Sequence, residues 1–188
     1  MKVLLLNGSP RKNGCTYTAL NVVADALKAE GIDAEVFQAG DPDMENVKAA
    51  AAKLKDSDAL VVGSPVYWAS PSGQIIEFMD RLASVAEKDM LYKPAAAVAS
   101  ARRAGTTATL DVLTKYFSYH QMPVVSSCYW NMVHGNTPDE VRQDEEGLQT
   151  MRTLGNNMAW LIKCIEAGKK AGITFPEREP AIKTNYIR

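Results

Sequence analysis

The feature that most constrains the fold of this chain is the alternation of short apolar runs with longer amphipathic segments. The apolar runs are too short for buried helices, whereas the segments between them repeat apolar residues at helical spacing. A parallel strand must be joined to the next by a crossover, which is usually a helix. The alternation therefore predicts an α/β fold with a parallel sheet covered by helices on both faces.

The pattern predicts five strands and five helices. The strands are expected at residues 3–6, 34–37, 59–63, 95–99 and 124–125. Helices are expected at 16–30 and 44–55, from a start at Ser70 and Pro71, after Gly105, and from Leu148 to Ile165. Alanine favours helices, so the assignment of 95–99 to a strand rests on its neighbours. The connection from Ser126 to Gln143 is long, and such connections tend to be functional or to form oligomer contacts.

Composition narrows the class of protein. A length of 188 residues predicts a single domain over residues 1–188. The 21 basic and 22 acidic residues give a net charge of -1, which argues against a nucleic-acid partner. No apolar run approaches the ~20 residues of a membrane span, and no signal-peptide core follows the first methionine. The expected location is the cytoplasm, without a membrane partner.

Cysteine usage gives no sign of a metal site. The three cysteines, Cys15, Cys128 and Cys164, are widely spaced and form no C-x-x-C pair. Structural zinc sites and redox disulfides usually need such pairs. We therefore expect no bound metal and a reducing compartment.

Three unusual loops follow the first, third and fourth predicted strands, at residues 8–18, 64–74 and 100–107. In an open sheet of order 2-1-3-4-5 these strands are neighbours, and ligands bind beyond their carboxyl ends. The sequence therefore predicts a ligand site built by these loops.

The first loop, Gly8 to Thr18, carries hydroxyl and small residues directly before a helix. The free N–H groups of a helix N-terminus attract phosphate, so the loop favours an anion site. Its spacing is neither that of a Walker loop nor G-x-G-x-x-G. A turn with a helix cap would explain the same residues one by one.

The other two loops add aromatic and basic side chains. Tyr67 and Trp68 suit stacking on a flat heteroaromatic ligand, or packing on a neighbouring helix or subunit. Arg102 and Arg103 join Arg11 and Lys12 at the same edge, either as a positive rim or as solvated surface arginines.

The loops resemble those of the NAD(P)H-dependent FMN reductases and related flavodoxin-like oxidoreductases, including the flavin domain of iron–sulfur flavoproteins. The resemblance rests on GSPRKNGCT at residues 8–16 and on SPVYWASPSGQ at 64–74, followed by Phe78, Asp80 and Arg81. The chain departs from the iron–sulfur relatives between Gln38 and Lys55, where it has no cysteine.

The resemblance implies a flavodoxin-like fold and an FMN site. It assigns the phosphate to Ser9, Arg11, Asn13, Gly14, Cys15 and Thr16, the ring and ribityl chain to Pro65, Val66, Tyr67 and Trp68, and the pyrimidine side to Ser100, Ala101, Arg102 and Gly105. It also implies a homodimer, with the connection 126–143 and the last helix as candidate contacts.

The implied activity is an oxidoreductase in which NAD(P)H reduces FMN and a flat small-molecule acceptor then takes the electrons. Such acceptors are quinones, nitro or azo aromatics, or free flavins. Because the flavin carries the chemistry, no catalytic side chain is expected. Trp68 and His134 are candidates for the substrate side, although His134 could instead close a turn.

Two other functions fit the same fold. A flavodoxin-type electron carrier would bind FMN and pass electrons to protein partners, but such carriers tend to be strongly acidic. A phosphoryl-transfer protein of the receiver type would need carboxylates after the first and third strands, where Asn7, Gly63 and Ser64 stand.

Overall fold

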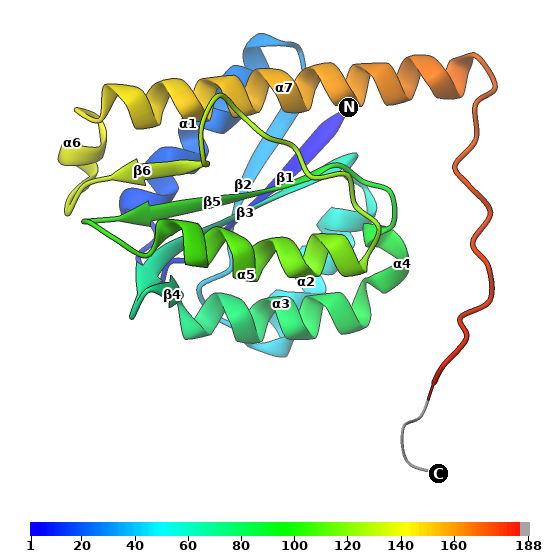
Figure 1. Cartoon of the computed structure of the whole chain (residues 1–188), viewed down its shortest axis with the longest axis horizontal. Coiled ribbons are helices and arrows are strands. Elements are labelled where there is room, and N and C mark those ends of the chain that lie inside the picture. The colour runs from blue at the N-terminus through cyan, green and yellow to red at the C-terminus, as the bar shows by residue number, and fades with distance from the viewer. Residues whose placement is uncertain (185–188) are drawn as a thin grey trace.

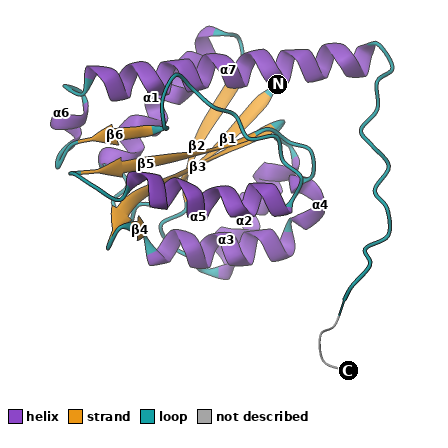
Figure 2. Ribbon diagram, viewed as in Figure 1, coloured by secondary structure: helices purple, strands orange, loops and turns teal. Residues whose placement is uncertain are grey.

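The computed structural model describes residues 1–184 and places a central sheet between two layers of helices (Figures 1 and 2). The strands are β1 (Lys2–Asn7), β2 (Asp33–Gln38), β3 (Ala59–Tyr67), β4 (Ser70–Pro71), β5 (Ala95–Ala101) and β6 (Met132–His134). The helices are α1 (Cys15–Ala29), α2 (Met44–Lys55), α3 (Gly73–Val85), α4 (Glu87–Met90), α5 (Thr106–Tyr119), α6 (Pro138–Val141) and α7 (Glu145–Lys170).

The main path of the sheet runs β2-β1-β3-β5-β6, and every pair along it is parallel. The short β4 lies off this path and pairs antiparallel with the end of β3. With β5 and β6 in the fourth and fifth positions, the predicted flavodoxin-like order 2-1-3-4-5 is confirmed. The strand order reverses between β1 and β3, which marks the carboxyl ends of these strands as the place for a ligand.

The core consists of two apolar layers, one on each face of the sheet. Successive strand residues point to opposite faces. Leu5 and Val61 therefore pack toward α1 and α7, while Leu4 and Val62 pack toward α2, α3 and α5. Burial of each such side chain contributes about 1.5–3 kcal/mol. These layers hold the strands, and hence the loops after them, in fixed positions.

The alanine-rich run is a strand, as predicted. All seven residues of β5 are buried, and α1 and α5 contact the strand from opposite faces. Small side chains allow both helices to approach closely. Pairing with β3 and burial on both faces outweigh the helical preference of alanine.

The predicted place of the fifth strand is wrong. Val124 forms an isolated bridge with Ala95, whereas the strand itself is β6, which pairs with Ala99–Ala101. The chain thus leaves the sheet after Val124 and returns at Met132. In β6, Val133 alone is buried, so the strand has no apolar run that a sequence pattern could reveal.

The predicted start of the third helix is also wrong. Ser70 and Pro71 form β4, and Ser72 is the residue that caps α3 by accepting a hydrogen bond from the Ile75 N–H at 3.4 Å. The Ser72 hydroxyl also donates to the Gly8 carbonyl at 2.9 Å. The cap therefore links α3 to the loop after β1, and the two residues in contact are distant in sequence.

The C-terminal segment turns back from the end of α7 and passes α4 (Figure 1). The Phe175 ring stacks on Tyr92 with 5.2 Å between centroids, and Arg178 lies 3.4 Å from the Glu87 carboxylate. Within residues 1–184, no helix combines the length and hydropathy that crossing a membrane requires.

Candidate functional site

The loop after β1 is held by side chains at the ends of β1 and β2. The Asn7 amide donates to the Lys12 carbonyl at 3.2 Å and to Gln38 Oε1 at 2.8 Å, and Asn7 Oδ1 accepts from the Ser9 N–H. Gln38 in turn donates to the Ser9 carbonyl at 2.6 Å. Because Asn7 is buried and Gln38 is half-buried, these hydrogen bonds hold the loop to the ends of β1 and β2.

The helix that follows this loop begins without a side-chain cap. Its N-cap is Gly14, which offers no acceptor for the first N–H groups of α1. The helix α5, which starts at Gly105, and the single-turn α4 also lack a side-chain cap. The other helices are capped by Asp43, Ser72, Thr137 and Asp144. The N-terminal amides of α1 and α5 are therefore available to an external acceptor, which an anion satisfies best.

A hollow of about 230 Å³ lies where the carboxyl ends of β1, β3 and β5 meet. Its lining residues are Ser9, Arg11, Cys15, Thr16, Pro65, Val66, Tyr67, Ser100, Ala101, Arg102, Gly135 and Asn136. Two of these described residues are arginines and none is acidic. The hollow is therefore positive in a chain whose net charge is close to zero, and it favours an anionic ligand.

The loop after β3 is a tight hairpin. Tyr67 pairs with Ser70, so the turn consists of Trp68 and Ala69, with φ angles of 53° and 57°. Both residues adopt the left-handed conformation that costs about 1–2 kcal/mol for a residue with a Cβ atom. The Trp68 side chain is 101% exposed, and Tyr67 is 40% exposed. The turn thus presents an indole ring to solvent at the edge of the hollow.

The loop after β5 packs on this hairpin. Gly105 has a φ of +97°, and a Cβ atom there would lie 2.7 Å from both Ala69 Cα and Val66 Cγ1. Glycine is required at this position for its backbone conformation and for the close approach. At the start of the loop, the buried hydroxyls of Ser100 and Thr16 share a hydrogen bond of 2.8 Å. The three loops are thereby joined around the hollow.

The Cys15 thiol is protonated at neutral pH. Burial raises its pKa above the ordinary value of 9.0, and Glu140 adds to the rise, although the Cys15 backbone N–H and Arg11 oppose it. The thiol donates weakly to the Gly135 carbonyl at 3.7 Å. Cys15 therefore serves as a packing and hydrogen-bonding residue of the hollow, since the nucleophilic form of cysteine is the thiolate.

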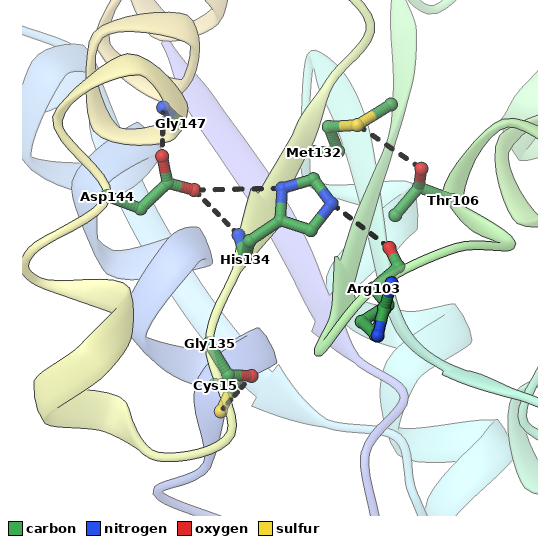
Figure 3. A network of polar contacts seen from close by, with 8 residues as sticks. All are labelled: Cys15, Arg103, Thr106, Met132, His134, Gly135, Asp144 and Gly147. Carbon is green, nitrogen blue, oxygen red and sulfur yellow. Dashed lines mark hydrogen bonds and ion pairs between the residues drawn. The ribbon is translucent and has the colours of Figure 1, made fainter.

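The structure brings most of the predicted site residues together. Ten of the fourteen proposed cofactor residues line the hollow, whereas Asn13, Gly14, Trp68 and Gly105 do not. Asn13 and Trp68 are exposed, and the two glycines cap α1 and α5. His134 lies beside the hollow at the end of β6, against Asp144 and the Arg103 carbonyl (Figure 3).

Sequence reasoning missed Gly135 and Asn136, which line the hollow from the end of β6. They reach it because β6 lies beside β5, with the Gly135 N–H donating to the Ala101 carbonyl at 3.0 Å. The assignment of the fifth strand to residues 124–125 removed the signal that would have found them. A strand ending at His134 places the next two residues at the ligand edge.

A larger hollow of about 670 Å³ lies between α3 and α5, lined by residues that include Asp80, Tyr116 and His120. None of the predicted site residues lines it. Its lining includes no residue from the carboxyl ends of the strands, where ligands of this fold bind, so the smaller hollow is the candidate site. His120 is the C-cap residue of α5 and is buried.

Comparison with known proteins identifies relatives of this chain. A family model described as NADPH-dependent FMN reductase matches residues 1–137. An iron–sulfur flavoprotein of Methanocaldococcus jannaschii is 29% identical, over 88% of this chain and 100% of that protein. An NADPH azoreductase of a Bacillus species is 30% identical, over 54% of this chain and 59% of the azoreductase.

Solved structures agree on the fold. A flavodoxin from the domain Archaea superposes with a TM-score of 0.68 and 18% sequence identity, covering 87% of this chain and 99% of the flavodoxin. At 18% identity the match shows that the fold is shared and does not show that the activity is shared.

The cysteines of this chain do not fit an iron–sulfur cluster. Clusters of this kind are usually held by four thiolates, and the chain has three cysteines. Cys15 lies in the hollow, Cys128 lies 3.7 Å from the Thr153 hydroxyl, and Cys164 is exposed on α7. No metal-binding cluster of His, Cys, Asp and Glu occurs among residues 1–184. The chain therefore shares the flavoprotein fold of its relatives without a ligand set for a cluster.

Proposed function

The chain belongs to the NADPH-dependent FMN reductase family and is a flavin-binding oxidoreductase, and from this premise we propose that it uses NAD(P)H to reduce a flat aromatic acceptor through FMN held in the hollow. The acceptors are quinones, nitro or azo aromatics, or free flavins. When bound, FMN supplies hydride acceptance from the nicotinamide and electron donation to the acceptor. The chain has to bind the flavin, orient it and leave one side of the ring open.

The observation that carries this proposal is the uncapped start of α1 beside an arginine. Gly14 leaves the first amides of α1 free, and Ser9, Arg11 and Thr16 line the hollow next to them. A phosphate group satisfies free helix amides and pairs with a guanidinium. The lining has no carboxylate that would repel it. The donor set therefore fits the phosphate of FMN.

The remaining lining suits the ring system. Pro65, Val66 and Tyr67 from β3 and Ala101 from β5 supply apolar and aromatic surface on either side of the hollow. The N-terminus of α5, uncapped at Gly105, adds free amides and a positive dipole end. Such donors would stabilise negative charge on a bound flavin ring, and Arg102 of the same loop would add positive charge there.

Trp68 is the proposed contact for the acceptor. Its ring is fully exposed on the strained hairpin at the edge of the hollow. A strained turn that exposes an indole ring costs folding free energy, which a role in binding would explain. The ring can stack on flat acceptors of different outline.

The first experiment is a visible absorption spectrum of the purified protein after incubation with FMN and gel filtration. NADPH, and separately NADH, is then added anaerobically to the same sample. The proposal expects a retained yellow chromophore that one of the two coenzymes bleaches. Retention without bleaching by either would favour an electron carrier, and loss of FMN on the column would contradict the assigned site.

We also propose that two copies of the chain form a homodimer through the connection 126–143 and α7. This surface exposes Tyr129, Trp130 and Trp160 by 53%, 57% and 68%, respectively. Exposed aromatic residues are enriched at protein interfaces. Light scattering after gel filtration should give twice the chain mass. Trp160→Asp should yield a monomer, whereas Tyr119→Asp on α5 should not, and the reverse result would assign the dimer to the face of α3 and α5.

A further inference from the structure

The segment Arg102–Gly105, named here the β5 loop, joins β5 to α5, and Arg102 lines the hollow. Arg102, Arg103 and Ala104 are exposed, and Gly105 already belongs to the start of α5. Within residues 1–184, a single side-chain hydrogen bond reaches the backbone of this loop. Its position therefore depends on what holds it from outside.

That hydrogen bond comes from His134 at the end of β6. The imidazole Nε2 lies 3.1 Å from the Arg103 carbonyl oxygen (Figure 3). A carbonyl only accepts, so Nε2 carries the proton and donates it. On the opposite side, Gly105 packs against Ala69 of the hairpin. The β5 loop is thus held between β6 and the hairpin.

His134 is itself fixed by Asp144. The His134 backbone N–H donates to Asp144 Oδ2 at 2.6 Å, and Asp144 Oδ1 accepts from the Gly147 N–H at 2.9 Å, capping α7. The Nδ1 atom lies 4.0 Å from the same carboxylate. Figure 3 shows the ring lying between Asp144 and the Arg103 carbonyl. The N-cap residue of the 26-residue helix α7 therefore holds the backbone of His134, whose ring contacts the loop.

We propose that His134, anchored by Asp144, is a positioning residue that fixes the β5 loop against the hollow. The inference rests on the proposed function for its effect on FMN. His134 touches the loop backbone and not the lining of the hollow. It acts by keeping Arg102 at the hollow in the absence of ligand, which lowers the conformational entropy that the loop loses when a ligand binds.

Two variants separate the hydrogen bond from the rest of the side chain. His134→Ala removes the donor, whereas His134→Gln keeps an N–H that can reach the Arg103 carbonyl. Ser127→Ala is the matched control, because Ser127 donates to the Tyr129 carbonyl at 2.7 Å within the same connection but away from the hollow. Thermal unfolding of all variants checks that the fold is retained.

The first readout needs no flavin. In the apoprotein, ¹⁵N order parameters of the β5 loop should fall in His134→Ala from the rigid range near ~0.85 toward ~0.6. They should stay close to the original values in His134→Gln and Ser127→Ala. Unchanged order parameters in His134→Ala, or an equal fall in His134→Gln, would overturn the proposal.

The second readout is the dissociation constant of FMN. His134→Ala should weaken binding by roughly fivefold, the effect of one lost hydrogen bond, and His134→Gln should restore most of it. If the original protein binds no FMN, the proposed function fails while the order parameters still test the loop. If it binds FMN and His134→Ala binds equally well, the positioning role is wrong.

Discussion

Some side chains of the hollow supply positive charge, and others give it a fixed shape. Arg11 and Arg102 supply positive charge, whereas Ser9, Thr16 and Ser100 are buried and fixed by hydrogen bonds to the loops themselves. Cys15 stays protonated because burial raises its pKa. The hollow therefore attracts an anion without offering a nucleophile.

Arg11→Glu should weaken FMN binding by roughly 10- to 100-fold, because it places a like charge beside the phosphate dianion. Fluorescence quenching of FMN during titration measures the effect. Lys12→Glu is the matched control, since it makes the same charge change one residue away, where the side chain does not line the hollow. An equal loss of FMN affinity in both variants would indicate a long-range electrostatic effect of the charge change. Unchanged affinity in Arg11→Glu would show that Arg11 does not contact the phosphate.

Trp68→Ala should raise the KM for a flat acceptor several-fold and leave the unfolding free energy within about 0.5 kcal/mol. The reason is that the indole ring is fully exposed, so its removal forfeits stacking on the acceptor but little packing. Steady-state kinetics with a quinone, together with denaturant unfolding, tests both parts. Lower stability with unchanged kinetics would show that Trp68 has a structural role instead.

At the scale of helices and strands, the site is built from element ends. The hollow is lined by residues from the loop after β1 and the start of α1, from the carboxyl ends of β3 and β5, and from the segment after β6. At the opposite ends of these elements, side chains form hydrogen bonds that stabilise the fold. Lys93, for example, donates from Nζ to the Lys55 carbonyl at the end of α2, and burial lowers its pKa.

The edge of the sheet carries a charged contact whose contribution depends on pH. Glu35 on β2 lies 2.6 Å from Lys53 of α2 and 3.1 Å from Lys2 of β1. The hydrogen bond from Lys53 lowers the pKa of Glu35 below 4.5, its ordinary value, and Lys2 contributes to the same shift. A carboxyl group with a lowered pKa in the folded state stabilises that state once the pH exceeds its unfolded pKa.

Glu35→Gln should therefore lower the unfolding free energy at pH 7 by about 0.5 kcal/mol, a small value because the carboxylate is one-third exposed. The difference should disappear as the pH falls through the lowered pKa, below 4.5, because the original carboxyl group is then neutral as well. Urea unfolding at pH 7 and at several acidic pH values measures it. A difference that persists unchanged in acid would point to lost packing rather than lost charge.

For the whole molecule, the shared fold and the missing ligand set separate this chain from its iron–sulfur relatives. The match to one such protein covers all of that protein and 88% of this chain. This chain nevertheless has only three cysteines, which lie in different parts of the fold. The similarity to an iron–sulfur flavoprotein therefore does not include a set of four cysteines in this sequence.

Purified protein loaded with FMN should contain less than roughly one-tenth of an iron atom per flavin, because three separated thiols do not provide the four ligands of a cluster. Metal analysis by plasma mass spectrometry and the visible spectrum measure this. The spectrum should show flavin bands without the broad absorption of iron–sulfur centres. Stoichiometric iron retained after gel filtration would contradict the prediction and would require ligands from a second copy.

The sequence alone determined the fold and most of the site, because both depend on local patterns. Apolar runs and helical spacing predicted the alternating strands and helices, and the family resemblance implied the strand order that the sheet has. Parallel strands in that order bring the loops after 3–6, 59–63 and 95–99 to one edge. Ten of the fourteen proposed cofactor residues line a common hollow for this reason.

The tertiary structure decided what depends on contacts distant in sequence. β6 has a single buried residue and is a strand because it lies beside β5, which places Gly135 and Asn136 in the hollow and His134 against the Arg103 carbonyl. Likewise, Ser72 rather than Ser70 caps α3, because β4 pairs with the end of β3. No periodicity within one segment encodes such pairings, since their free energy comes from a partner elsewhere in the chain.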